Sequence, residues 1–305
     1  MSPSPQQGAF IHPPPPASPR GFLGRIRVTL EMIKFEHSIF ALPFALTGAM
    51  LARRGLPAWR ELVWIIVAMV GARSAAMTFN RIADLKLDAL NPRTQARALP
   101  AGQLSLGFAI AFTMGSCALL VLAAWQLNPL AFALSPVVIV ILLGYSFTKR
   151  FTILSHLILG LCLGMSPAAA WIALRGDLSV SVLLLGAAVM LWVAGFDIIY
   201  ACQDVEFDHS LGLHSIPRRY GIRVALWISA LLHVGTLALL IAVVRMENLG
   251  WIAAGGLAAV AALLAYEHSL VKPRDLSRVN AAFFTVNGFI SILFFLTWAV
   301  DLLIH

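Results

Sequence analysis

Charged residues and cysteines are both scarce in this chain. Of its 305 residues, 12% are Asp, Glu, Lys or Arg, whereas 60% are hydrophobic. A soluble globular domain needs much more polar surface, so this composition excludes one. The three cysteines, Cys117, Cys162 and Cys202, have no paired spacing, which excludes a disulfide framework and a cysteine-based metal knuckle.

Long apolar stretches take the place of the missing polar sequence. The mean hydropathy is +0.85, and the apolar runs are near the length of about twenty residues with which a helix crosses roughly 30 Å of hydrocarbon. We therefore predict an all-α polytopic membrane protein with about nine transmembrane helices. The expected spans are at about 37–53, 61–79, 104–124, 130–147, 153–172, 180–200, 222–244, 250–270 and 280–303.

The N-terminal segment differs from the rest in composition. Its first twenty residues contain the run "HPPPP" and no apolar signal-peptide core, and proline-rich sequence does not form a helix interior. Residues 1–34 are predicted to be a disordered tail with a cytoplasmic lead-in, followed by a single transmembrane domain over 35–305.

The distribution of Lys and Arg predicts the orientation of the spans. With the N-terminus inside, sixteen of the 22 Lys and Arg residues fall in inner segments and five in outer ones, as expected when short cytoplasmic loops retain positive charge. This topology also accounts for most of the net charge of +8 without a nucleic-acid partner. The remaining cation, Arg73, lies inside the second span.

Two groups of acids follow the second and sixth spans. In "NRIADLKLDALNPRT", Asn80, Asp84 and Asp88 recur every four residues, so they are expected on one side of a helix end. A solvated loop whose acids pair with Lys86 and Arg93 is the alternative.

The second group makes a shared site more plausible than a solvated loop. In "DIIYACQDVEFDHSLGLHSIP", Asp197, Asp204 and Asp208 again fall close to one helical face, at the same inner side of the membrane. Two such oxygen-rich rows suit Mg²⁺, which binds a few carboxylates and completes its shell with water and phosphate oxygens. A diphosphate bridged by two ions is the expected ligand.

Cations that could bind such a diphosphate lie on the same inner face. A Lys-Arg pair at a span end is often only an interfacial anchor, but beside two acid rows it favours a diphosphate clamp. The residues expected to contribute are Tyr145, Ser146, Lys149 and Arg150 in "GYSFTKRFT", with Arg93 and Arg97 in "NPRTQARALPAG". Arg73, two helical turns before Asn80, could form an internal salt bridge or receive a substrate anion such as an aromatic carboxylate.

The order of these motifs resembles the UbiA family of intramembrane aromatic prenyltransferases. The matching residues are an Arg seven positions before N-x-x-x-D-x-x-x-D at Asn80 to Asp88, then Y-x-x-x-K-R at Tyr145 to Arg150, then D-x-x-x-D at Asp204 and Asp208. The resemblance covers nearly the whole chain after the tail. "KFEHSIFALPFALTGAMLA" and "YACQDVEFD" are most similar to the bacterial branch that acts on 4-hydroxybenzoate, or to its menaquinone-pathway relatives.

The resemblance implies nine helices around a central cavity with a lateral opening to lipid, in a bacterial inner membrane. It also implies Mg²⁺-dependent transfer of a polyprenyl group from an allylic diphosphate to the ring of a hydroxylated aromatic acid, either 4-hydroxybenzoate in quinone biosynthesis or a dihydroxynaphthoate. Asp197 would orient the assembly or receive the ring proton, and Lys149 and Arg150 would stabilise the departing diphosphate. The implied ligands of Mg²⁺ are Asn80, Asp84, Asp88, Asp204 and Asp208.

The aromatic acceptor would be recognised by Arg73, with Tyr200 and His37 as further candidates. For His37, which follows Glu36, a polar pair at the start of a helix is the alternative.

Two other classes of protein also place acids in a membrane. An ion-coupled secondary transporter would not need phosphate-binding cations beside both acid rows. A CDP-alcohol phosphotransferase concentrates its acids in one glycine-containing motif, which this chain lacks.

Overall fold

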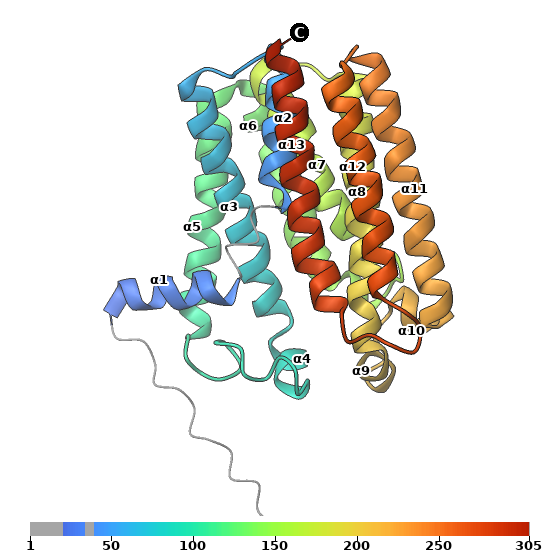
Figure 1. The fold of residues 1–305 in the computed structure, drawn as a ribbon. Helices are drawn as coiled ribbons and strands as arrows, with labels where there is room; N and C mark the ends of the chain where they lie inside the picture. Colours follow the sequence, from blue (N-terminus) through green and yellow to red (C-terminus); the bar gives the residue numbers. More distant parts are fainter. Residues whose placement is uncertain (1–20, 34–39, 305) are drawn as a thin grey trace, which may run out of the picture.

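The computed structural model describes residues 21–33 and 40–304, and these residues are almost entirely helical. Figure 1 shows long helices side by side, with short helices at one end of the bundle. The α-helices are α1 Gly21–Met32, α2 Leu42–Arg53, α3 Trp59–Ala83, α4 Leu85–Leu90, α5 Leu106–Leu127, α6 Pro129–Gly144, α7 Ser155–Arg175, α8 Val180–Ala201, α9 Val205–Ser210, α10 Ile216–Tyr220, α11 Ile222–Met246, α12 Trp251–Leu270 and α13 Asn287–Ile304. Two 3₁₀ segments, η2 Tyr145–Arg150 and η3 Cys202–Asp204, and a π-helical segment, η4 Ala281–Val286, connect some of them.

The observed helices confirm the polytopic all-α fold. Eight helices in the described part of the chain are long and apolar enough to cross a membrane, and they correspond to the second to ninth expected spans. The first expected span, 37–53, is described from residue 40 and contains α2, which packs against α7 and α13. The expected tail at 1–20 lies outside the described residues, and α1 occupies most of the lead-in that follows.

Side-chain caps fix the starts of several spans, including α5 and α6. The Ser105 hydroxyl accepts a hydrogen bond from the Phe108 amide at the start of α5. The Asn128 side chain does the same for Ala131 at the start of α6, where Pro129 occupies the first helical position. These residues satisfy amides that have no partner within their helix.

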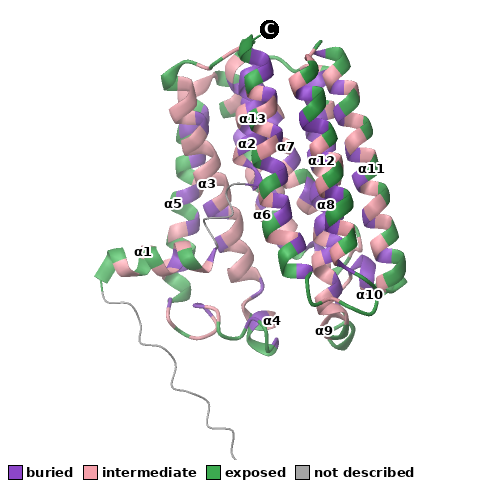
Figure 2. Ribbon diagram, viewed as in Figure 1, coloured by how far each residue is buried: buried purple, intermediate pink, exposed green. Residues whose placement is uncertain are grey.

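The surface of the bundle follows the expectation for a protein solvated by lipid. Buried residues form inward stripes on the long helices (Figure 2), whereas Trp227, Leu231 and other large apolar side chains are exposed on the outward side of α11. The exposed Trp59 and Trp251 both lie at the end of the bundle opposite α4 and α9. Tryptophan is enriched at membrane interfaces.

Two of the short helices carry an acid of the two rows, since Asp88 lies on α4 and Asp208 on α9. Helices α4, α9 and α10 lie at the same end of the bundle, and α1 lies crosswise to the bundle at that end (Figure 1). This places the segments after α3 and α8 near each other, although about 120 residues separate the two acid rows in the sequence.

Candidate functional site

A polar pocket of about 200 Å³ lies between the segments that follow α3, α6 and α8. Both acid rows and four cations line it. Its lining comprises Asn80, Arg81, Asp84, Leu87, Asp88, Asn91, Arg93, Thr94, Arg97, Tyr145, Ser146, Thr148, Lys149, Ser155, His156, Asp197, Tyr200, Ala201, Asp204, Phe207, Asp208, Leu213, His214 and Ser215.

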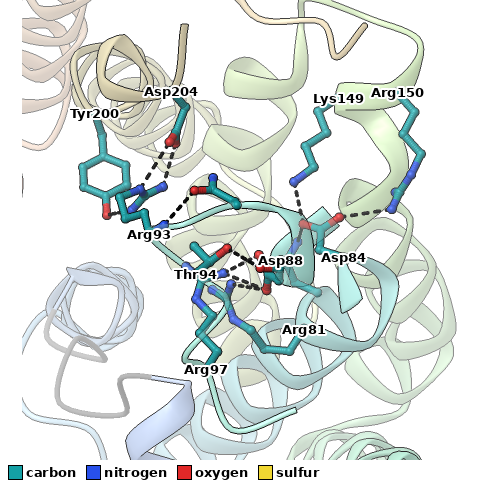
Figure 3. A network of polar contacts seen from close by, with 12 residues as sticks. Arg81, Asp84, Asp88, Arg93, Thr94, Arg97, Lys149, Arg150, Tyr200 and Asp204 are labelled. Carbon is teal, nitrogen blue, oxygen red and sulfur yellow. Dashed lines mark hydrogen bonds and ion pairs between the residues drawn. The ribbon is translucent and has the colours of Figure 1, made fainter. Parts of the chain in front are cut away.

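Asp84 lies where α3 ends and α4 begins, and it binds two cations from η2. Lys149 Nζ donates to one carboxylate oxygen at 2.6 Å and Arg150 Nη2 donates to the other at 3.1 Å (Figure 3). The Asn80 side-chain amide, one turn earlier, lies 3.4 Å from the same carboxylate. Asp84 is only 3% exposed, so these cations offset the cost of burying its charge.

Asp88 is held by a second pair of cations. Arg97 Nη1 lies 2.8 Å from both carboxylate oxygens, and Arg81 Nη1 lies 3.6 Å from one of them. The Thr94 hydroxyl donates to the Asp88 carbonyl at 3.0 Å and so fixes the loop that carries Arg97 (Figure 3).

Arg93 connects the loop after α4 to the second acid row. Its guanidinium forms two hydrogen bonds with the Asp204 carboxylate, at 2.6 and 3.2 Å, and donates to the Tyr200 hydroxyl at 2.8 Å (Figure 3). Burial acts to lower the pKa of Arg93, but Asp204 and Tyr200 together raise that pKa above its usual value. The guanidinium therefore stays charged across the working pH range.

The other acids of the second row have different partners. Asp208 accepts a hydrogen bond from the Ser215 hydroxyl at 2.7 Å. Asp197 lies 2.7 Å from Nδ1 of the buried His156, whose Nε2 accepts a hydrogen bond from the Ile216 amide at 3.4 Å. Since Nε2 acts as the acceptor, Nδ1 carries the proton toward Asp197.

Arg73 lies outside this pocket, in an adjoining apolar cavity of about 170 Å³. Tyr145 lines both spaces, so it stands between them. A second apolar cavity, of about 280 Å³, shares Met69 and Leu120 with the first and extends toward the opposite end of the bundle. A polar pocket thus adjoins an almost entirely apolar interior.

The structure brings together most of the residues singled out in the sequence. Arg150 does not line the pocket but contacts Asp84, Arg73 lies in the adjoining cavity, and His37 is outside the described residues. The predicted residues that line the pocket are Asn80, Asp84, Asp88, Arg93, Arg97, Tyr145, Ser146, Lys149, Asp197, Tyr200, Asp204 and Asp208.

Sequence reasoning missed several polar residues of the pocket, among them Arg81, His156 and Ser215. Arg81 and His156 are ionisable groups at the ends of membrane spans, and that position is itself a signal of function. Ser215 gave no such signal, because its contact with Asp208 depends on how the loop after α9 folds back.

The acids suit a divalent cation that takes few protein ligands. Within the described residues, no three His, Cys, Asp or Glu side chains form a ready-made metal cage. Magnesium rarely needs one, since it is commonly held by one or two carboxylates with waters and substrate phosphates. The carboxylates and the Asn80 amide supply hard oxygen ligands around a pocket that also offers cations to a phosphate, so the residues fit Mg²⁺ with a diphosphate.

Known proteins resemble this chain in both sequence and fold. The chain is 31% identical to a 4-hydroxybenzoate octaprenyltransferase of Tolumonas auensis, over 80% of this chain and 85% of that protein, and 34% identical to one of Vibrio cholerae, over 79% and 85%. The solved apo structure of a UbiA homologue from Aeropyrum pernix is 40% identical with a TM-score of 0.80, covering 88% of this chain and 98% of that one. A UbiA homologue from Archaeoglobus fulgidus bound to GPP and Mg²⁺ is 19% identical with a TM-score of 0.73, covering 90% and 99%, and so shares the fold.

A family model locates the match along the chain. Residues 41–299 match the UbiA prenyltransferase family, which spans every transmembrane helix except the last residues of α13 and includes both acid rows. This chain therefore belongs to the UbiA prenyltransferase family and is an integral membrane prenyltransferase.

Proposed function

We propose that this enzyme transfers a polyprenyl group from an allylic diphosphate to the ring of 4-hydroxybenzoate or a closely similar aromatic acid, in a reaction that depends on Mg²⁺. The observation that carries the proposal is the polar pocket, in which two acid rows and four cations adjoin an apolar cavity containing Arg73. The names of the relatives from Tolumonas and Vibrio support 4-hydroxybenzoate as the acceptor. The GPP and Mg²⁺ bound to the Archaeoglobus homologue support the donor and the metal.

The acid rows would hold the metal. Bound Mg²⁺ would neutralise part of the charge of the diphosphate and so make it a better leaving group. Its proposed ligands are Asn80, Asp84, Asp88, Asp204 and Asp208.

Lys149 in the pocket and Arg150 beside it would stabilise the leaving group. When the C1–O bond of the allylic diphosphate breaks, its electron pair stays on the diphosphate oxygen, and Lys149 and Arg150 are placed at Asp84 to meet that charge. Arg93 and Arg97 would approach the same diphosphate from the loop after α4. Tyr145 and Ser146 line the pocket beside them as further diphosphate contacts.

The aromatic acceptor would lie on the Arg73 side of Tyr145. Arg73 would bind its carboxylate from the apolar cavity, while Tyr200 on α8 would contact the acceptor from the polar pocket. The ring carbon beside the hydroxyl forms a bond to C1, and the ring then loses its proton. We assign that proton to the Asp197 carboxylate, which His156 Nδ1 orients. The apolar cavities beyond Tyr145 would exclude water, which would otherwise convert the allylic cation to an alcohol.

A product assay tests the proposal directly. Purified protein in nanodiscs is given an allylic diphosphate and Mg²⁺, with 4-hydroxybenzoate and 1,4-dihydroxy-6-naphthoate in parallel reactions analysed by mass spectrometry. We expect prenylated 4-hydroxybenzoate, and no product when EDTA removes the metal. Product from the naphthoate alone would move the enzyme to menaquinone biosynthesis, and diphosphate binding without any product would reject both acceptors.

A further inference from the structure

A buried polar cluster lies in the part of the bundle that the pocket does not reach. Glu267 on α12 and Asn287 at the start of α13 are both 0% exposed. The Asn287 side-chain amide donates to Glu267 Oε1 at 2.8 Å, and the Trp192 indole donates to Asn287 Oδ1 at 2.8 Å. A carboxylic acid inside a membrane-spanning bundle is costly and commonly marks a functional element.

Asn287 directly follows the π-helical segment Ala281–Val286 and binds its backbone. Besides Glu267, its side-chain amide lies within hydrogen-bond distance of the carbonyls of Ala282, at 3.1 Å, and Phe283, at 3.3 Å. In an α-helix the Phe283 carbonyl would receive the backbone N–H of Asn287, but that N–H donates to Phe284 instead. The Asn287 side chain thus satisfies a carbonyl that the π-helical turn leaves without its ordinary partner.

The π-helical turn determines where Phe283 points. A π turn holds one more residue than an α turn, so restoring ordinary α-helix here would rotate Phe283 by about 100° relative to the helix that follows. In its present position the Phe283 ring packs on the Tyr200 ring, with centroids 4.2 Å apart. Tyr200 in turn accepts the hydrogen bond from Arg93 and lies under its guanidinium, 5.4 Å from the ring centroid.

We propose that Glu267 and Asn287 are positioning residues that fix Tyr200 and Arg93 at the mouth of the pocket, acting through the π-helical turn and Phe283. This inference rests on the proposed function where it gives Arg93 to the diphosphate. Neither Glu267 nor Asn287 lines the pocket, so loss of the cluster should weaken binding of the donor and leave the chemical step nearly intact.

The function of Glu267 in this cluster is to accept a hydrogen bond. Its Oε1 receives the Asn287 amide, whereas Oε2 lies 4.0 Å from Nδ1 of His233. Glutamine keeps an acceptor oxygen at nearly the same volume, while leucine removes it. Glu267→Gln should therefore preserve the π-helical turn that Glu267→Leu disrupts.

Fluorine NMR of protein labelled with 3-fluorotyrosine tests the positioning without any assay of activity. The chain has only four tyrosines, so Tyr→Phe variants assign each resonance, including that of Tyr266 beside Glu267. We expect the Tyr200 resonance to shift in Glu267→Leu and Asn287→Leu and to stay in place in Glu267→Gln. The matched control is Thr236→Val, which removes a buried hydroxyl that binds the Ala188 carbonyl on α8. A Tyr200 resonance that stays in place in both folded leucine variants overturns the proposal.

Kinetics supply the second measurement. In both leucine variants we expect KM for the allylic diphosphate to rise about tenfold with kcat within twofold, and Glu267→Gln to behave as wild type. A fall in kcat shared with Thr236→Val would indicate general damage to the fold and would overturn the proposal. If the leucine variants do not fold, Phe283→Leu must reproduce both the shift and the rise in KM, or the proposal fails. If wild-type protein forms no product, the proposed function fails while the NMR comparison still decides the positioning.

Discussion

The two nearly buried acids of the pocket each form ion pairs with cations from another part of the chain. Asp84 meets Lys149 and Arg150 from η2, and Asp88 meets Arg97 from the loop after α4. An unpaired buried charge would cost several kcal/mol, so the fold itself requires these pairs. The same cations are the groups that we propose bind the diphosphate. A test that substitutes these residues must therefore distinguish a loss of protein stability from a loss of catalysis.

Loss of a single carboxylate charge should abolish most of the activity. Asp84→Asn and Asp204→Asn keep the size of the side chain but remove its charge, so we expect product formation in the mass-spectrometric assay to fall roughly 100-fold or more, as when a preorganised polar group is removed from other active sites. Glu206→Gln is the matched control, because Glu206 is an exposed acid on α9 between Asp204 and Asp208. Normal turnover in either Asp variant would defeat the metal assignment.

Arg73 should affect the acceptor more than the donor. If its guanidinium binds the acceptor carboxylate, Arg73→Ala loses a charge-assisted pair, and KM for 4-hydroxybenzoate should rise by about tenfold or more. KM for the allylic diphosphate should change little, which initial rates at varied donor and acceptor concentrations will test. An equal loss for both substrates would assign Arg73 to structure instead.

At the scale of whole helices, small residues allow the bundle to pack closely. A Cβ added to Gly164 on α7 would lie 2.4 Å from the backbone carbonyl oxygen of Gly186 on α8, and one added to Gly160 would lie 2.2 Å from that of Met190. Backbones that approach this closely leave no room for a methyl group, a common device in membrane bundles. Helix α7 carries His156 and helix α8 carries Asp197, so the distance between these helices affects where the two side chains lie in the pocket.

Gly164→Ala should therefore destabilise the protein. The added methyl must push α7 and α8 apart, and overpacking of this kind typically costs about 1–3 kcal/mol. Thermal unfolding in detergent should show a lower midpoint than wild type. Gly115→Ala on α5 is the matched control, because a Cβ there meets nothing within 4 Å, and its midpoint should be unchanged or higher. Equal midpoints for the two variants would contradict the close-packing argument.

At the scale of the whole molecule, Lys and Arg are distributed unevenly between the two ends of the bundle. The pocket and its cations lie at the end with α4 and α9, while the exposed Trp59 and Trp251 lie at the other end. The positive-inside rule therefore predicts that the pocket opens to the cytoplasm.

Cysteine labelling tests this orientation. In a variant with its three cysteines replaced by alanine, Gln95→Cys lies in the exposed loop that carries Arg93 and Arg97, and Leu178→Cys lies in the half-exposed loop between α7 and α8. A membrane-impermeant maleimide added to intact bacterial spheroplasts should label Leu178→Cys, and should label Gln95→Cys only after permeabilisation. The reverse pattern would invert the topology.

Sequence alone determined the spans, the orientation prediction and half of the residues that line the pocket. The bilayer imposes a minimum length on apolar helices, so hydropathy locates them without knowledge of their packing. The spacing of four residues also located both acid rows, although neither row lies on one uninterrupted helix. Asp84 separates α3 from α4, and η3 separates α8 from α9.

Only the tertiary structure decided which side chains meet. Arg93 and Asp204 are 111 residues apart, and no local periodicity can pair them. The hydrogen bond between Asn287 and Glu267 likewise depends on a π-helical turn, which hydropathy does not predict. Membrane insertion is governed by each segment's own transfer free energy, whereas hydrogen bonds and ion pairs depend on the packing of segments distant in the chain.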